Sequence, residues 1–202
     1  MSELHVLLLP GGSDPGPWHW QRWLAARARE AGAVVTRWAD ADGLGALRAG
    51  LSRVPPDAEL AVVAHRGGAD AWLRHVAAPA PSAPAATAPR RADRVLLVAP
   101  PPSRPGSSEI DAPALRHAGG PTRLVVGEAD PVLPERAAAA LARRLRVELD
   151  VLPGVGELDT AAGYGPWPAL LRWVLYGSVP VADRVEAAPR TAGCSPVPEG
   201  AR

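Results

Sequence analysis

Short apolar runs, each bounded by turn residues, alternate with longer amphipathic stretches along most of this 202-residue chain. This alternation is typical of βα units, which build a mostly parallel sheet buried between layers of helices. The apolar runs predict strands at 5–10, 33–38, 60–65, 94–100, 122–128 and 147–153. The stretches between them predict helices at about 17–31, 42–53, 67–78, 134–146 and 166–176.

Two segments interrupt the pattern. Residues 77–91 are rich in Ala and Pro, which predicts a flexible excursion after the third helix, and the chain from 178 onward is rich in Pro and Gly and lacks apolar periodicity. We therefore expect one domain over residues 1–177, followed by a disordered tail over 178–202. A hydrophobic content of 47% is enough to give that single domain a proper core.

The balance of charge and the cysteine count exclude several classes of protein. Twenty-two basic and 21 acidic residues give a net charge of +1, so the basic footprint of a nucleic-acid binder is missing. No apolar run approaches the roughly 20 residues that span a bilayer, and the one cysteine, Cys194, cannot form an internal disulfide. A cytoplasmic protein is expected. The absence of lysine fits a GC-rich genome, such as an actinobacterial one.

The segment from Ala64 to Gly68, which reads A-H-R-G-G, lies between a predicted strand and a predicted helix. Small residues stand two positions before and two after its centre, as in the nucleophile elbow, where a sharp strand-to-helix turn crowds its neighbours. The centre of such a turn should be Ser, Cys or Asp. Here it is Arg66, which cannot be deprotonated in a protein and cannot attack a carbonyl group.

Four blocks of the chain resemble the small serine hydrolases related to retinoblastoma-binding protein 9 and the bacterial YdeN-like proteins. The block from Pro10 to Gln21 is similar to the family's P-G-W-G-N-S-G-P-E-H-W-Q, and the block from Gly156 to Pro168 to its G-H-I-N-A-A-S-G-x-G-P-W-P. Between them, 64–68 matches A-H-S-L-G and 128–131 matches the D-D-P turn that carries the acid. The resemblance implies an α/β-hydrolase-like three-layer sandwich with a mostly parallel central sheet.

Carried over by resemblance, the family triad falls on Arg66 for the serine, Asp130 for the acid and Glu157 for the histidine. Hydrolysis by that mechanism needs both a nucleophile and a base, and both are replaced here by residues of opposite charge. If the family geometry holds, Arg66 and Glu157 form an ion pair, with Asp130 as a second carboxylate nearby. The sequence thus predicts a catalytic centre made of these three residues.

Further candidates for substrate binding surround this centre. The backbone N–H groups of Gly12, Ser13 and Gly67 fall where the family forms its oxyanion hole. Trp18 stands where the family carries Glu, and its apolar surface favours a hydrophobic small-molecule substrate. The remaining candidates are His19, His65 and Asp159, although for His19 capping and packing at the start of the first helix is the better interpretation.

The leading hypothesis is a non-hydrolytic enzyme, a cyclase, lyase or isomerase that acts on an intermediate of specialised metabolism through Arg66 and Glu157. Two alternatives remain open: a catalytically dead pseudo-hydrolase that serves as a binding module, and a cryptic serine hydrolase that uses Ser13. The five histidines and single cysteine form no metal-ligand spacing, and no dinucleotide or phosphate-loop fingerprint is present. We therefore expect no metal, no cofactor, no nucleic-acid partner and no membrane association.

Overall fold

The computed structural model describes residues 2–12, 16–38, 43–78, 90–102, 110, 112–177 and 181. Its centre is a six-stranded sheet in the order β2-β1-β3-β4-β5-β6, and all neighbouring strands are parallel. The strands are β1 (Leu4–Leu9), β2 (Val34–Arg37), β3 (Glu59–His65), β4 (Arg94–Val98), β5 (Thr122–Gly127) and β6 (Glu148–Leu152). All six strands were predicted from the apolar runs.

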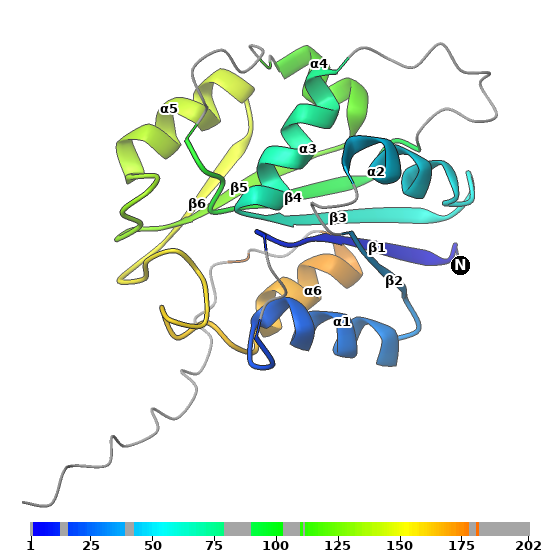
Figure 1. Ribbon diagram of the computed structural model, residues 1–202, viewed down its shortest axis with the longest axis horizontal. Coiled ribbons are helices and arrows are strands. Elements are labelled where there is room, and N and C mark those ends of the chain that lie inside the picture. Colours follow the sequence, from blue (N-terminus) through cyan, green and yellow to red (C-terminus); the bar gives the residue numbers. More distant parts are fainter. Residues whose placement is uncertain are drawn as a thin grey trace, which may run out of the picture.

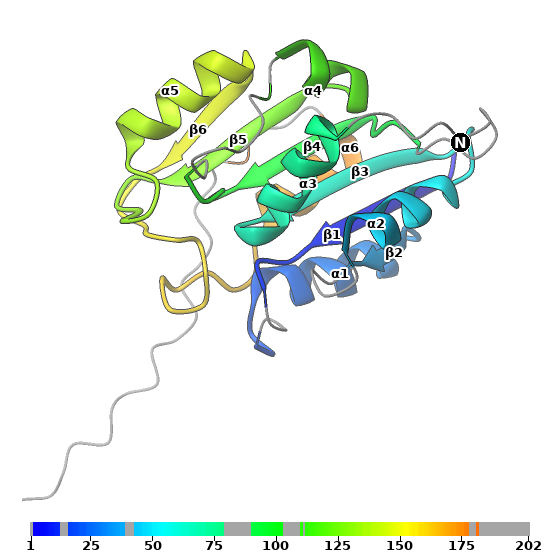
Figure 2. The same cartoon turned by 45° about the horizontal axis from the view of Figure 1, so that its top comes forward.

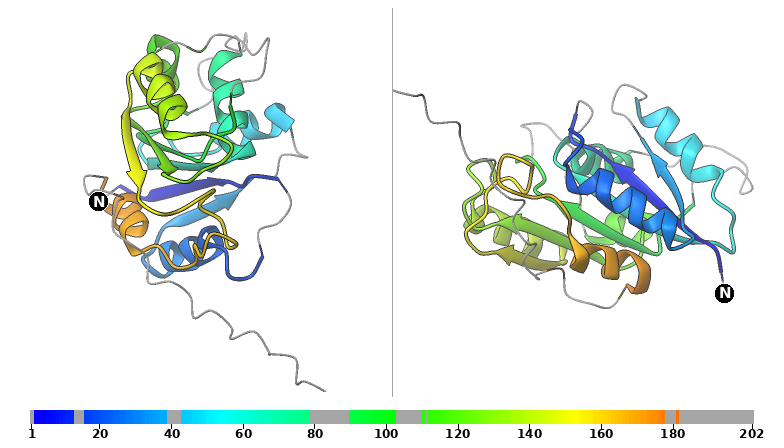
Figure 3. Two further views of the ribbon diagram at one scale, coloured as in Figure 1. Left: turned by 90° about the vertical axis from the view of Figure 1, so that its left-hand side faces the viewer. Right: turned by 90° about the horizontal axis from the view of Figure 1, so that it is seen from below.

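Helices cover both faces of the sheet, as Figure 1 and the left view of Figure 3 show. Two helices, α1 (Trp20–Glu30) and α6 (Pro168–Tyr176), lie on one face. The other face carries α2 (Gly43–Ser52), α3 (Gly67–Ala77), α4 (Ala112–Ala118) and α5 (Glu135–Leu145), which Figure 2 brings forward. The expected three-layer α/β sandwich is confirmed.

The two layers of helices explain the continuous apolar runs of the central strands. In β3, side chains alternate between the faces, so Val62 and Ala64 join the core beneath α2 to α5 whereas Val63 joins the core beneath α1 and α6. Because both faces are covered, every residue from Leu60 to Ala64 is buried. Parallel strands also bring all their carboxyl ends to one edge of the sheet, and the loops at that edge carry the candidate site.

Two features differ from the expected element pattern. The helix α4 was not predicted, because it has only seven residues and Pro113 interrupts its apolar pattern. The helix α1 begins at Trp20, three residues later than predicted, because His19 caps it and residues 16–19 form a turn. Most of the segment 77–91, which was expected to be a flexible excursion, lies outside the described residues. Near its end, the guanidinium of Arg90 forms an ion pair with Asp93 at 3.0 Å.

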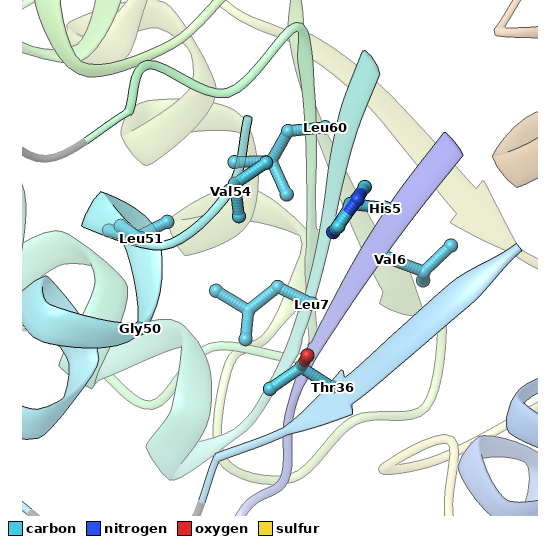
Figure 4. A pocket seen from close by; sticks show the side chains of 8 residues that line it. All are labelled: His5, Val6, Leu7, Thr36, Gly50, Leu51, Val54 and Leu60. Carbon is cyan, nitrogen blue, oxygen red and sulfur yellow. The ribbon is translucent and has the colours of Figure 1, made fainter. Parts of the chain in front are cut away.

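A small notch opens between α2 and the edge of the sheet formed by β1 and β2 (Figure 4). It holds about 20 Å³, room for about one water molecule, and is lined mainly by apolar side chains and by Gly50 of α2. A Cβ added at Gly50 would meet nothing within 4 Å. The notch is therefore a minor packing defect rather than a ligand site.

Val181 falls within the segment that was expected to be a tail, yet it is fully buried in the core beneath α1 and α6. Its carbonyl accepts a hydrogen bond from Nε1 of Trp167, at 3.2 Å. The folded unit thus includes at least one residue beyond α6. The other residues of 178–202 lie outside the described part of the chain.

This contact leads to a prediction about where the chain can be shortened. A chain that ends after Ala182 should melt as the full chain does, because it retains Val181. A chain that ends after Gly177 loses one buried apolar side chain and one buried hydrogen bond, and its free energy of unfolding should fall by about 1–3 kcal/mol. Thermal melts of the two truncated chains check this difference, and identical melting temperatures would show that Val181 contributes nothing.

Candidate active site

The turn between β3 and α3 is strained. Arg66 at its apex has φ 49° and ψ −117°, a backbone conformation that costs a residue other than glycine about 1–3 kcal/mol. Hydrogen bonds hold it there: its N–H donates to the carbonyl of Val98 at 2.9 Å, and its carbonyl accepts from Ala69 at 2.9 Å and Asp70 at 3.1 Å. The turn therefore has the backbone expected of a nucleophile elbow, with its central side chain exposed at the carboxyl edge of the sheet.

Glycines make room for this turn, as the sequence motif predicts. A Cβ at Gly68 would lie 2.1 Å from the carbonyl oxygen of Leu9 in β1, and a Cβ at Gly11 would lie 2.6 Å from the Cβ of Arg66. Neither position can hold a larger residue without a shift of the backbone. The loop after β1 is thus packed directly against the elbow.

Arg66 and Glu157 are brought together, as expected from the family geometry. The Arg66 guanidinium donates through Nη1 to Oε2 of Glu157, which lies in the loop between β6 and α6. The Arg66 side chain remains 32% exposed and that of Glu157 remains 26% exposed. Solvent can therefore reach the pair, and among the described residues Nε and Nη2 of Arg66 donate to no other group.

The loop that carries Glu157 is anchored from below by two buried side chains. Nε1 of Trp20 donates to the carbonyl of Leu158 at 2.8 Å, and Nε2 of His65 donates to the carbonyl of Glu157 at 3.3 Å. Leu158 is fully buried and has φ 57°, so this loop also holds a strained residue. These contacts fix the backbone on which the Glu157 carboxylate is presented to Arg66.

His19 and His65 form a buried aromatic cluster with Trp20, with ring centroids 5.2–5.3 Å apart. Burial lowers the pKa of His65 to about 3 and that of His19 to about 4, although the nearby charge of Asp159 opposes the shift of His19. Both rings are therefore neutral at pH 7. Nδ1 of His19 accepts from the Gln21 N–H at 3.2 Å and caps α1, which supports the structural interpretation of that residue.

The Asp130 carboxylate stabilises the turn after β5, and its place as the third member of the centre stays a prediction. Its carboxylate is buried and accepts from the N–H groups of Val132 at 2.8 Å and Leu133 at 3.0 Å. Within the described residues no hydrogen bond or ion pair links it to either partner of the pair. An aspartate before proline readily caps its own turn, which is the signal that the sequence offered for this role.

Two backbone N–H groups lie close to the elbow. A Cβ built on Gly67 would be 3.8 Å from the nitrogen of Gly12, so the two glycines are neighbours across the β1 loop. Neither N–H donates to another described residue. This is the arrangement expected of an oxyanion hole, near the positive N-terminal end of α3. Ser13, the third predicted member, lies outside the described residues.

The remaining candidates are more peripheral. Trp18 is 77% exposed in the turn before α1, and its backbone lies beside Gly165 of the loop after β6. The Asp159 carboxylate accepts from the N–H of Ala162 at 2.8 Å and stabilises that loop. In the described part of the chain, no cluster of three His, Cys, Asp or Glu side chains could hold a metal ion, and no helix is long and apolar enough to cross a bilayer.

Sequence reasoning did not identify the anchoring roles of Trp20 and Leu158. Nothing in the spacing of Trp20 indicates a hydrogen bond to a loop 138 residues away. A positive φ at a leucine has no sequence signal, since that conformation is normally adopted by glycine or asparagine.

A parallel sheet between two helical layers, with a strained strand-to-helix turn presenting its central side chain, defines the α/β-hydrolase class. The chain belongs to the serine hydrolase family, whose profile matches residues 6–175. No curated protein is significantly similar in sequence.

Solved structures agree with this assignment. A YdeN-like hydrolase from Pectobacterium atrosepticum is 25% identical, with a TM-score of 0.61 over 88% of this chain and 94% of that one. The ydeN gene product of Bacillus subtilis is 16% identical, with a TM-score of 0.68 over 86% and 97% of the two chains. An alpha-beta serine hydrolase homologue from Coxiella burnetii is 12% identical, with a TM-score of 0.58 over 89% and 88%.

Proposed function

We propose that this chain is a non-hydrolytic enzyme on an α/β-hydrolase scaffold, in which Arg66 and Glu157 replace the nucleophile and the base of the family. The observation that carries the proposal is the ion pair at the apex of the strained turn, in which both side chains remain partly exposed to solvent. A guanidinium cannot attack a carbonyl group, so the covalent mechanism at this turn has no first step.

The donors around the turn suit a substrate with a carbonyl group. The N–H groups of Arg66, Gly12 and Gly67 that donate to no described residue can hold a carbonyl oxygen and stabilise the negative charge that develops on it. Glu157 can then accept a proton from the neighbouring carbon. Enolisation of this kind is the first step of many cyclisations, eliminations and isomerisations, and we assign the enzyme to these classes.

The substrate expected here is a small molecule with an apolar body that packs against the exposed ring of Trp18. An intermediate of specialised metabolism is the proposed substrate class. His65 supports the site through the backbone, since it donates to the carbonyl of Glu157, whereas Asp130 stabilises its own turn after β5.

Two other functions have specific support. The family match and the N–H groups of Gly12 and Gly67, which donate to no described residue, favour a cryptic serine hydrolase in which Ser13, the residue after Gly12 in the sequence, is the nucleophile. The ion pair favours a binding module, because Arg66 and Glu157 satisfy each other without any substrate. Covalent labelling of a serine would distinguish the cryptic hydrolase from the proposed enzyme. Turnover of a substrate would distinguish the proposed enzyme from the binding module.

We expect no labelling of the wild-type protein by a fluorophosphonate probe, because Arg66 stands in place of the serine at the elbow and Glu157 in place of the histidine that would activate it. Intact-protein mass spectrometry measures the adduct directly. The variant Arg66→Ser/Glu157→His, which restores the family residues at both positions, is the comparison, and Ser13→Ala is the control. Stoichiometric labelling of the wild type that is lost in Ser13→Ala would establish the cryptic hydrolase instead.

A further inference from the structure

A groove of about 810 Å³ lies at the amino edge of the sheet, opposite the edge that carries Arg66. Its walls are the first residues of β4, β5 and β6 and the last residues of α4, α5 and α6. In Figure 1 this is the edge at which the parallel strands begin, on the side of the marked N-terminus. The groove is therefore separate from the candidate active site.

The groove carries an excess of positive charge. Each carboxylate that lines it already has an arginine partner: Glu59 pairs with Arg94, Asp93 with Arg90, and Glu148 with Arg123. Three further arginines line the groove without a carboxylate partner among the described residues: Arg91, Arg116 and Arg146. Among the described residues, the guanidinium of Arg91 donates to the backbone carbonyls of Arg116, His117 and Gly119. A ligand in this groove would thus meet cations that no acidic side chain of the described residues neutralises.

The base of the groove combines a buried cation with apolar side chains. Arg94 is 6% exposed and lies 5.9 Å from the ring of Trp173, and its Nε is buried with no hydrogen-bond partner among the described residues. The apolar surface that a ligand can reach in this groove belongs to Tyr176, which is 70% exposed, and to the partly exposed Val147.

We propose that this groove binds an organic anion with an apolar body, such as a medium-chain carboxylate. Its charged group would lie between the guanidinium groups of Arg116 and Arg146, and its hydrocarbon part would cover Tyr176 and Val147. Guanidinium forks suit a carboxylate because they offer paired donors in one plane. The proposal concerns binding alone and is independent of the function assigned to Arg66 and Glu157.

Isothermal titration calorimetry with dodecanoate, below its micelle concentration, tests the site. The variant Arg116→Gln/Arg146→Asn removes both free cations, and it should fold because asparagine tolerates the left-handed backbone of Arg146, φ 54°. Arg53→Gln/Arg136→Gln is the matched control, since it removes the same charge from residues that do not line the groove. We expect saturable binding by the wild type and the control, weakened at least about tenfold in the groove variant.

A second measurement locates the ligand. Amide chemical shifts of Gly119 and Gly120, which line the groove, should move on titration with dodecanoate, and decanol, which lacks the charge, should leave them unmoved. Equal affinity in the groove variant and the wild type would overturn the proposal. So would the absence of saturable binding to the wild type, or shift changes confined to residues at the carboxyl edge of the sheet.

Discussion

Replacing Gly68 with alanine should destabilise the protein by about 3 kcal/mol or more, which corresponds to a fall in melting temperature of roughly 6–12 °C for a domain of this size. The added Cβ would lie 2.1 Å from the carbonyl oxygen and 2.5 Å from the carbonyl carbon of Leu9. Both are backbone atoms of β1, at a position that pairs with Ala64 of β3 in the sheet. Relief of the contact therefore requires α3 to move away from the sheet, and the elbow with it.

The matched control is the same substitution at Gly50. That glycine lies inside α2 beside the notch of Figure 4, and a Cβ there meets nothing within 4 Å. Alanine is the better helix former, so Gly50→Ala should stabilise the protein by about 0.5–1 kcal/mol. Opposite shifts of the two variants in thermal melts would confirm that the crowding is local to the elbow. A Gly68→Ala variant that melts with the wild type would show that the turn is not packed as described.

The strands and the elbow could be predicted from the sequence because their signals are local. An apolar run between turn residues indicates a buried strand, and small residues around Arg66 indicate a crowded turn; β3 and α3 lie within a residue of their expected bounds. The proximity of Arg66 and Glu157 came from the resemblance to a family, which supplies the contact between residues 91 positions apart that no local pattern contains.

The features that were missed depend on tertiary contacts. Val181 is a single apolar residue between the end of α6 and a Pro/Gly-rich stretch, so the local sequence gives no sign that it is buried. Its burial depends on the tertiary contact with Trp167 and the core around it. The basic groove is equally invisible in sequence, because its arginines come from separate helix ends and loops.

Replacing one partner of the Arg66 and Glu157 pair should lower the free energy of unfolding. Replacing both partners should restore part of that loss. Arg66→Met leaves the Glu157 carboxylate without its partner, and Glu157→Leu leaves the guanidinium without its partner. Because each side chain keeps about a quarter to a third of its surface exposed, the expected loss is about 1–3 kcal/mol for each single variant, less than for a fully buried pair.

The double variant Arg66→Met/Glu157→Leu leaves no unpaired charge, and its free energy of unfolding should return to within about 1 kcal/mol of the wild type. The exposed pair of Arg27 and Glu30 on α1, 49% and 58% exposed, is the matched control, and the same substitutions there should change stability by less than about 1 kcal/mol in any combination. Denaturant unfolding of the two cycles measures both. Additive losses at Arg66 and Glu157 would show that the two side chains do not interact energetically.

Because the double variant is expected to fold, it also allows the proposed function to be tested without loss of the scaffold. The decisive measurement is untargeted mass spectrometry of a metabolite extract from the source organism, incubated with the wild type or with Arg66→Met/Glu157→Leu at equal concentrations of folded protein. We predict that the wild type consumes at least one carbonyl compound and forms a product without loss of an acyl group, and that the double variant lowers this turnover at least about a hundredfold. Equal turnover by the two proteins would contradict the assignment of Arg66 and Glu157 as the reacting centre, and no turnover by the wild type would favour the binding module.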